Sequence, residues 1–309
     1  MIKAIAILIL VFSVTVVYAG EIEQKDAPLR YFTQPEGIAG SKTPYGDNAE
    51  AAHYVQAGDA KIYCETYGEG RPIFVLHGGG VGSSYELGAI IDRLRENYKV
   101  IIPSTRGHGR SEIGHSPLTY EQKAQNMLAV MSEITNKPAP ILGFSDGAYT
   151  SYKIASLKPE AVERIVAIGA GTLKSCYYSP EINLGDLEKV DPAYIRQMKR
   201  LAPEPERIQE FLSSYMSFWS KANIGKELFS SIRCPVLLIA GDEDDHAPVL
   251  TVLEAHQYIP NSRLCIIPKA WHTAFLDNLP LTWTAISQFL SAPLGTLVPS
   301  TKLTQNDAN

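Results

Sequence analysis

Ser145 is the residue whose surroundings point most directly to chemistry. It lies in a G-x-S-x-G pentapeptide, residues 143–147, between the apolar segment 139–142 and the helix-compatible segment 148–157. This order predicts a sharp strand-to-helix turn that pushes the serine hydroxyl toward solvent. The flanking glycines are needed because a Cβ at either position would collide with the turn. A serine hydroxyl is a poor nucleophile at neutral pH, so the chain must also supply a base and an acid.

Two later loops contain such groups. The apolar segment 235–240 is typical of a buried parallel strand, and a glycine and the acidic run 242–245 follow it directly. The apolar segment 264–268 is typical of another buried strand, and His272 lies just beyond its end. Sites in open parallel sheets form at the carboxyl ends of the strands. We therefore expect these loops to meet Ser145.

The order Ser, Asp, His predicts a catalytic triad. Ser145 is the predicted nucleophile, and His272 is the predicted base that takes up its proton and returns it to the leaving group. Asp244 is the predicted acid, because it lies three residues after the glycine of its loop and four before a proline; Asp245 is the alternative. His246 is expected to be a surface residue.

Two backbone N–H groups are expected to stabilise an oxyanion. One belongs to Asp146, directly after the nucleophile. The other is assigned to Gly79, with Gly80 next, in the His-Gly-Gly-Gly turn 77–80. Glycines in this turn let the backbone approach a substrate closely. Gly80, Asp146 and Trp271 are the predicted substrate-binding residues.

These motifs, with the Arg-Gly-His-Gly-Arg-Ser segment 106–111, resemble those of α/β-hydrolase superfamily serine hydrolases over roughly residues 52–290. The alternation of strands and helices itself predicts a mostly parallel sheet covered on both faces. The resemblance implies the α/β-hydrolase fold, with eight strands and a helical cap insertion. The aspartate directly after the serine and the chain length are similar to the valacyclovir hydrolase-like (biphenyl hydrolase-like) esterase branch.

Asp146 has two interpretations. In the biphenyl hydrolase-like branch, an acid at this position is implicated in binding the α-amino group of the substrate. The structural alternative is that a carboxylate in the first turn of a helix is favoured by the helix dipole. Both interpretations stay open on the sequence.

The chain is expected to divide into a signal peptide at 1–19, an N-terminal extension at 20–51, an α/β-hydrolase domain at 52–291 with a cap at about 171–230, and a flexible tail at 292–309. A positive start, an apolar stretch and small residues before the cleavage site are typical of a signal peptide. The protein is therefore expected to be exported, periplasmic or secreted, without stable membrane insertion after cleavage. An uncleaved anchor is the alternative.

Bulk composition excludes several classes. The 309 residues suffice for one α/β domain, and the net charge of −5 does not favour nucleic acid as a partner. The seven histidines show no metal-ligand spacing, and the four consecutive acids are expected to be solvated except for one, so no metal or other cofactor is predicted. The four cysteines are too few for a disulfide scaffold, and whether any pair forms stays open.

The predicted function is hydrolysis of a small carboxylic ester through an acyl-enzyme intermediate. The expected partner is a small-molecule ester or amide, and the oligomeric state is undetermined. The alternatives are an aminopeptidase, amide or C–C bond hydrolase on the same triad, and a ligand-binding protein that turns over little, since fold alone does not determine chemistry.

Overall fold

The computed structural model describes residues 28–179 and 181–296, so the predicted signal peptide and most of the predicted tail lie outside the described residues. The strands within these ranges are β1 (Ala52–Ala57), β2 (Ala60–Tyr67), β3 (Arg71–Leu76), β4 (Tyr98–Pro103), β5 (Ala139–Phe144), β6 (Val162–Ile168), β7 (Val236–Gly241) and β8 (Ser262–Ile267). They form one sheet in the order β1-β2-β4-β3-β5-β6-β7-β8. The pairs β1–β2 and β2–β4 are antiparallel and the others are parallel. The predicted eight-stranded, mostly parallel sheet is confirmed.

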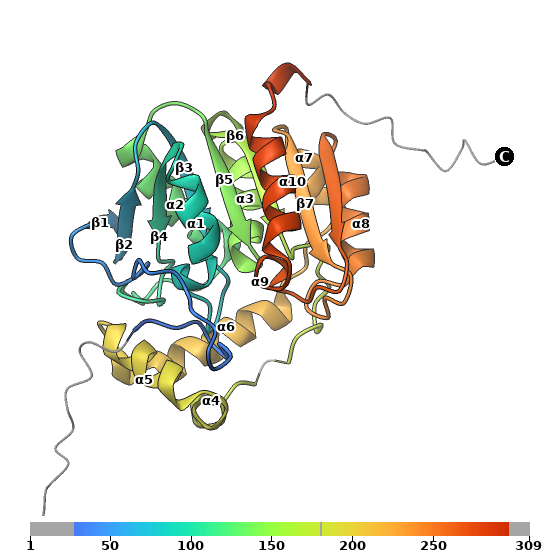
Figure 1. Cartoon of the computed structure of the whole chain (residues 1–309). Helices are drawn as coiled ribbons and strands as arrows, with labels where there is room; N and C mark the ends of the chain where they lie inside the picture. The colour runs from blue at the N-terminus through green and yellow to red at the C-terminus, as the bar shows by residue number, and fades with distance from the viewer. Residues whose placement is uncertain (1–27, 180, 297–309) are drawn as a thin grey trace, which may run out of the picture.

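Helices cover both faces of the sheet (Figure 1). The flanking helices are α1 (Gly88–Leu94), α2 (Tyr120–Ile134), α3 (Asp146–Leu157), α8 (Val249–Tyr258), α9 (Ala274–Asp277) and α10 (Leu279–Ser291). Successive strand residues point to opposite faces, so Ile141 packs into the layer with α2, α3 and α8, while Leu142 packs into the layer with α1 and α10. This two-sided burial explains the continuous apolar runs in the central strands.

The described residues between β6 and β7 form four α-helices: α4 (Leu184–Val190), α5 (Pro192–Leu201), α6 (Ile208–Lys221) and α7 (Lys226–Ser231). Helices α4, α5 and α6 lie together beyond one end of the strands (Figure 1). Helix α7 lies beside α3 instead, where the rings of Phe229 and Tyr152 are 5.2 Å apart. The helices of the predicted cap that can cover the site are therefore α4 to α6.

The N-terminal extension joins the cap to the sheet domain. Arg30 forms a 3.0 Å ion pair with Asp191 at the start of α5, and its backbone N–H donates to Gln197 on the same helix. Further along, Ser41 donates a hydrogen bond to Asp92 on α1. The extension therefore crosses the surface from α5 to α1.

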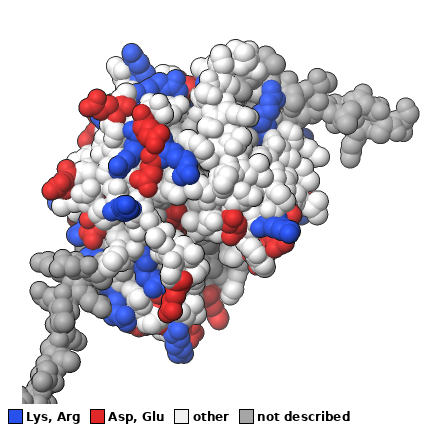
Figure 2. Space-filling view, viewed as in Figure 1, with Lys and Arg blue, Asp and Glu red and all other residues white. Residues whose placement is uncertain are grey.

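The surface charges, the helices and the cysteines can be compared with the expectations from composition. On the face shown in Figure 2, acidic and basic side chains of the described residues are interspersed. None of the helices within residues 28–179 and 181–296 is long and apolar enough to cross a membrane. All four cysteines fall within the described ranges, and each is a free thiol.

Candidate active site

Ser145 occupies a strained turn between β5 and α3. Its φ of 51° lies in the left-handed region, which residues other than glycine rarely adopt. Its backbone N–H donates to the carbonyl of Ile168 at 2.8 Å, which ties the turn to the end of β6. A Cβ on Gly147 would lie only 2.3 Å from the carbonyl oxygen of Leu76, and one on Gly143 would lie 2.5 Å from that of Gly147. The two glycines of the motif therefore allow the turn to pack against β3 and α3.

Asp244 and His272 form a direct pair. His272 Nδ1 lies 2.9 Å and 3.0 Å from the two carboxylate oxygens of Asp244. Asp244 Oδ1 also accepts the backbone N–H groups of His246 and Ala247, both at 2.8 Å. Burial alone would raise the pKa of Asp244, but the bonds from His272 and these N–H groups hold it below its ordinary value. Asp245, the alternative acid, bonds His246 instead and is exposed.

The loops after four parallel strands meet at Gly169, the residue after β6. Its φ is +64°, and a Cβ there would lie 2.9 Å from His272 Cε1 and 3.5 Å from Asp244 Oδ2. The preceding carbonyl, of Ile168, accepts the N–H of Ser145. The ring of Phe144 lies 4.9 Å from the His272 ring. The ends of β5, β6, β7 and β8 thus bring the predicted nucleophile, acid and base to one place.

His77 holds the loop that carries the predicted oxyanion donor Gly79. Its Nε2 accepts the backbone N–H of Thr105 at 2.9 Å, so its Nδ1, 2.6 Å from the Gly78 carbonyl, carries the proton and donates. Burial lowers the pKa of His77 to about 4, which keeps the ring neutral in this arrangement. On the other side, Glu86 accepts the N–H of Gly78 at 3.2 Å, and burial raises the pKa of Glu86 to about 7.

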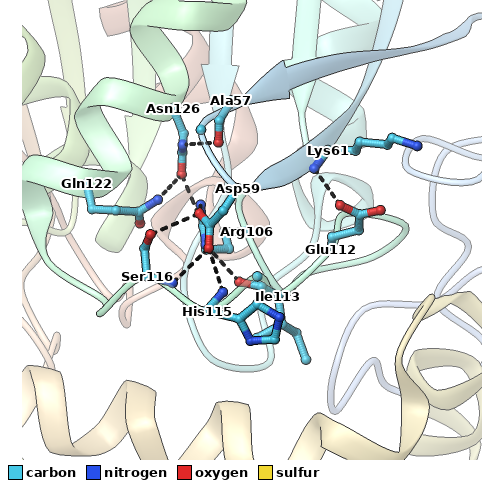
Figure 3. A network of polar contacts seen from close by, with 12 residues as sticks. Ala57, Asp59, Lys61, Arg106, Glu112, Ile113, His115, Ser116, Gln122 and Asn126 are labelled. Atoms are coloured by element: carbon cyan, nitrogen blue, oxygen red, sulfur yellow. Dashed lines mark hydrogen bonds and ion pairs between the residues drawn. The ribbon is translucent and has the colours of Figure 1, made fainter.

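A network around Arg106 fixes the segment that supports His77 (Figure 3). Arg106, next to Thr105, donates to Asp59 in the turn between β1 and β2 at 2.6 Å and to the Ile113 carbonyl at 3.1 Å. Asn126 of α2 joins the network through Arg106 Nε and the Ala57 carbonyl. The bond from Arg106 holds the pKa of Asp59 far below its usual range, so the pair stays charged. The Arg-Gly-His-Gly motif therefore anchors a loop and lies outside the reacting centre.

Helix α6 lies directly on Gly79. A Cβ at this residue would come within 2.3 Å of the Tyr215 hydroxyl and 2.7 Å of the Trp219 ring. A Cβ on Gly80 would instead meet no atom of the described residues within 4 Å. The other side of α6 borders a groove of about 1320 Å³, whose lining includes Tyr120 but neither Ser145 nor His272. Aromatic side chains of α6 therefore cover Gly79, whereas Gly80 faces open space.

Asp146 is fully covered: its side chain is 0% exposed. Its Oδ2 lies 2.5 Å from the ammonium of Lys123, which is 2% exposed, and its Oδ1 accepts a 3.2 Å bond from the Trp219 indole. The carboxylate is thus paired within the protein, which favours the structural interpretation of Asp146 over amine binding. The one sequence signal for Lys123 is its place on the buried face of α2, among Tyr120, Ala124 and Met127.

Trp271 and His246, which come from the loops after β8 and β7, differ in their placement. Trp271 is 54% exposed, so its role in substrate binding stays a prediction. The ring of His246 is exposed on one side, as expected, but its other side stacks on the His272 ring, with centroids 4.8 Å apart and planes 22° apart. The sequence argument missed this contact, as it missed Glu86 and Lys123. Ligand atoms of Asp244, Asp245 and His246 lie within 4.8 Å of one another, but both Asp244 oxygens are already bonded to the protein.

Comparison with known proteins agrees with the fold. The model of the family described as alpha/beta hydrolase fold matches residues 71–195. Serine hydrolase BPHL of Homo sapiens is 23% identical and the alignment covers 77% of this chain and 85% of that protein. The 2-hydroxy-6-oxo-6-(2'-aminophenyl)hexa-2,4-dienoic acid hydrolase of Metapseudomonas resinovorans is also 23% identical, with coverage of 79% and 92%. The crystal structure of a serine hydrolase involved in carbazole degradation, the CarC enzyme, matches with a TM-score of 0.66 at 23% identity, covering 78% of this chain and 98% of that one.

The fold, the placement of the motifs and these similarities define an α/β-hydrolase. The chain is similar to serine hydrolases of the biphenyl hydrolase-like branch that its motifs resemble.

Proposed function

We propose that this protein hydrolyses small carboxylic esters through an acyl-enzyme intermediate, with Ser145, His272 and Asp244 as its triad. The observation that carries the proposal is the Asp244–His272 pair at 2.9 Å, at the point where the loop after β6 touches both His272 and the Ser145 turn. A carboxylate on Nδ1 fixes the tautomer in which Nε2 is free to accept a proton.

The expected steps follow from these positions. His272 Nε2 takes the proton of the Ser145 hydroxyl as the oxygen attacks the ester carbonyl, and a tetrahedral intermediate forms. The N–H groups of Gly79 and Asp146 receive the developing negative charge. Asp146 is suited to this because it is the first residue of α3, and the N–H groups of a helix's first turn have no partner within the helix. His272 then protonates the departing alcohol, and a water molecule, activated by the same imidazole, releases the acid.

The coverage by the cap favours a small substrate. Tyr215 and Trp219 lie against Gly79 and leave the open side at Gly80. The similarity to the dienoic acid hydrolase makes C–C cleavage the second candidate, because that relative covers most of this chain. We also propose export through the segment 1–19, which N-terminal sequencing of protein from the producing cells would test.

The decisive experiment is the initial rate on short p-nitrophenyl esters for the wild type, Ser145→Ala and Ser214→Ala. Ser214 is an exposed serine on α6 and serves as the matched control. Loss of the nucleophile should lower kcat by at least about 10³-fold, whereas the control should retain the wild-type rate. Ester turnover that survives Ser145→Ala would contradict the triad. Absence of ester turnover in the folded wild type, with hydrolysis of a dienoic keto acid, would favour the second candidate.

A further inference from the structure

A cluster of four side chains joins the nucleophile turn to the cap. We call Lys123, Asp146, Tyr215 and Trp219 the Lys123 cluster. Lys123 Nζ lies 2.5 Å from Asp146 Oδ2 and 2.7 Å from the Tyr215 hydroxyl, and it also lies 4.6 Å from the centre of the Tyr215 ring. Trp219 donates its indole N–H to Asp146. One ammonium and one carboxylate therefore hold two aromatic residues of α6.

The Lys123 cluster surrounds both predicted oxyanion donors. Asp146 supplies one donor from its own backbone and the cluster's carboxylate from its side chain. Tyr215 and Trp219, four residues apart on α6, present one face of the helix to Gly79, the other donor. A shift of α6 would therefore move the side chains that cover Gly79 and the partner of Asp146 together.

Each buried charge in this cluster needs a partner of opposite sign. A buried carboxylate without a counter-ion is strongly unfavourable, and the same holds for a buried ammonium. Burial, followed by the nearby Asp146 carboxylate, raises the pKa of Tyr215 well above its ordinary value, so the phenol stays protonated beside Lys123. The cluster thus pairs the buried carboxylate next to Ser145 with an ammonium of the protein itself.

We propose that Lys123 is a positioning and specificity-determining residue: its ammonium occupies the Asp146 carboxylate and holds Tyr215 and Trp219 over Gly79, so that the site selects acyl groups without a positive charge. This inference rests on the proposed ester hydrolysis and names the substrate class of that site. A substrate ammonium would find no free carboxylate at Asp146 and would be repelled by Lys123 nearby, a built-in penalty against the wrong substrate.

The test compares p-nitrophenyl butyrate with the p-nitrophenyl ester of 2-aminobutyrate, at about pH 6, where the α-amino group is protonated. The wild type should prefer the neutral ester in kcat/KM by at least about tenfold. In Lys123→Met, kcat on the neutral ester should fall by about 10²-fold, because the oxyanion donors lose their support. The preference for the neutral ester should also fall by at least about tenfold, because the released carboxylate can pair with the substrate ammonium.

Two further variants separate positioning from simple loss of folding. Lys123→Met with Asp146→Asn contains no unpaired charge and should regain the wild-type preference for the neutral ester, although kcat stays low. Tyr215→Phe keeps the ion pair, so kcat should fall on both esters alike with the preference unchanged. A folded Lys123→Met variant with wild-type kcat and preference would overturn the proposal. A wild type that prefers the amino ester would overturn it as well.

Hydrogen exchange distinguishes failure of this inference from failure of the proposed function. If the wild type cleaves neither ester, the proposed function fails. The positioning role of the Lys123 cluster is then tested by the exchange rates of the backbone amides of α6. These amides should exchange at least about tenfold faster in Lys123→Met and in Tyr215→Phe, while those of α8, which packs on β7 and β8, stay unchanged. Exchange of α6 at the wild-type rate in both variants would reject the positioning role.

Discussion

Two buried carboxylates flank Ser145, and they are stabilised in different ways. Asp244 is 5% exposed and accepts two backbone N–H groups besides His272. Asp146 is 0% exposed, pairs with the Lys123 ammonium and accepts the Trp219 indole N–H. One carboxylate is paired with an imidazole, and the other is paired with an ammonium.

This difference separates chemistry from positioning. In the proposed mechanism, the backbone donors to Asp244 hold the carboxylate that orients His272, the base of the reaction. Asp146 is paired with the Lys123 ammonium instead, and in our proposal this pair positions the cap. Four measurements test this difference, and the largest effect is expected for the carboxylate that orients the proposed base.

Asp244→Asn should lower kcat by about 10⁴-fold, because an amide on Nδ1 favours the wrong tautomer of His272. The fold should persist, since the amide oxygen can still accept the N–H groups of His246 and Ala247. Steady-state kinetics measures the loss, and Asp245→Asn is the matched control, expected within about threefold of wild type. Equal losses in the two variants would mean that the pairing seen for Asp244 does not orient the base.

Lys123→Met should lower the free energy of unfolding by about 3–5 kcal/mol, because it leaves a buried carboxylate unpaired. Adding Asp146→Asn should restore most of this loss. Urea denaturation measures both, with Lys153→Met as the control: its ion pair with Glu121 is much more exposed and should contribute less than about 1 kcal/mol. If the two substitutions lower the free energy of unfolding equally, the Lys123–Asp146 pair does not stabilise the fold as a buried ion pair.

Glu86→Gln should change how stability depends on pH. The folded pKa of Glu86 is about 7 and exceeds the ordinary value of 4.5, so the folded state is favoured while the carboxyl is protonated. This contribution is complete below about pH 4.5 and is lost as the pH rises through about 7. Between pH 5 and pH 8, this effect should lower the free energy of unfolding of the wild type by up to about 2 kcal/mol. The glutamine variant should not show this fall. Urea denaturation at both pH values measures it, and an equal decline in both proteins would show that Glu86 ionises without cost.

His246→Gln should have the smallest effect. It removes the ring that stacks on His272 but keeps the backbone N–H that Asp244 accepts. We expect kcat within about threefold of wild type and a loss of stability of about 1 kcal/mol or less. A tenfold or larger fall in kcat would mean that the stack, and not only Asp244, holds His272 in place.

The sequence by itself determined the sheet and the positions of the predicted triad on it. Continuous apolar runs specify buried parallel strands, and a glycine-flanked serine after such a run specifies the turn, because these preferences act within a few residues of the chain. The order of the loops then places Ser145, Asp244 and His272 at one edge, since all parallel strands end there. Gly79 follows the end of β3 by three residues, so the same reasoning puts its loop at that end of the strands.

Only the tertiary structure decided which charged groups meet. Lys123 and Asp146 lie in different helices. The residues around a lysine on an apolar helix face do not indicate which carboxylate it will pair with. Tyr215 and Trp219 reach them from a cap whose docking depends on packing across the whole molecule. The cost of burying a charge depends on what surrounds it in three dimensions, so the fate of Asp146, paired within the protein rather than open to a substrate, could not be deduced from the turn that contains it.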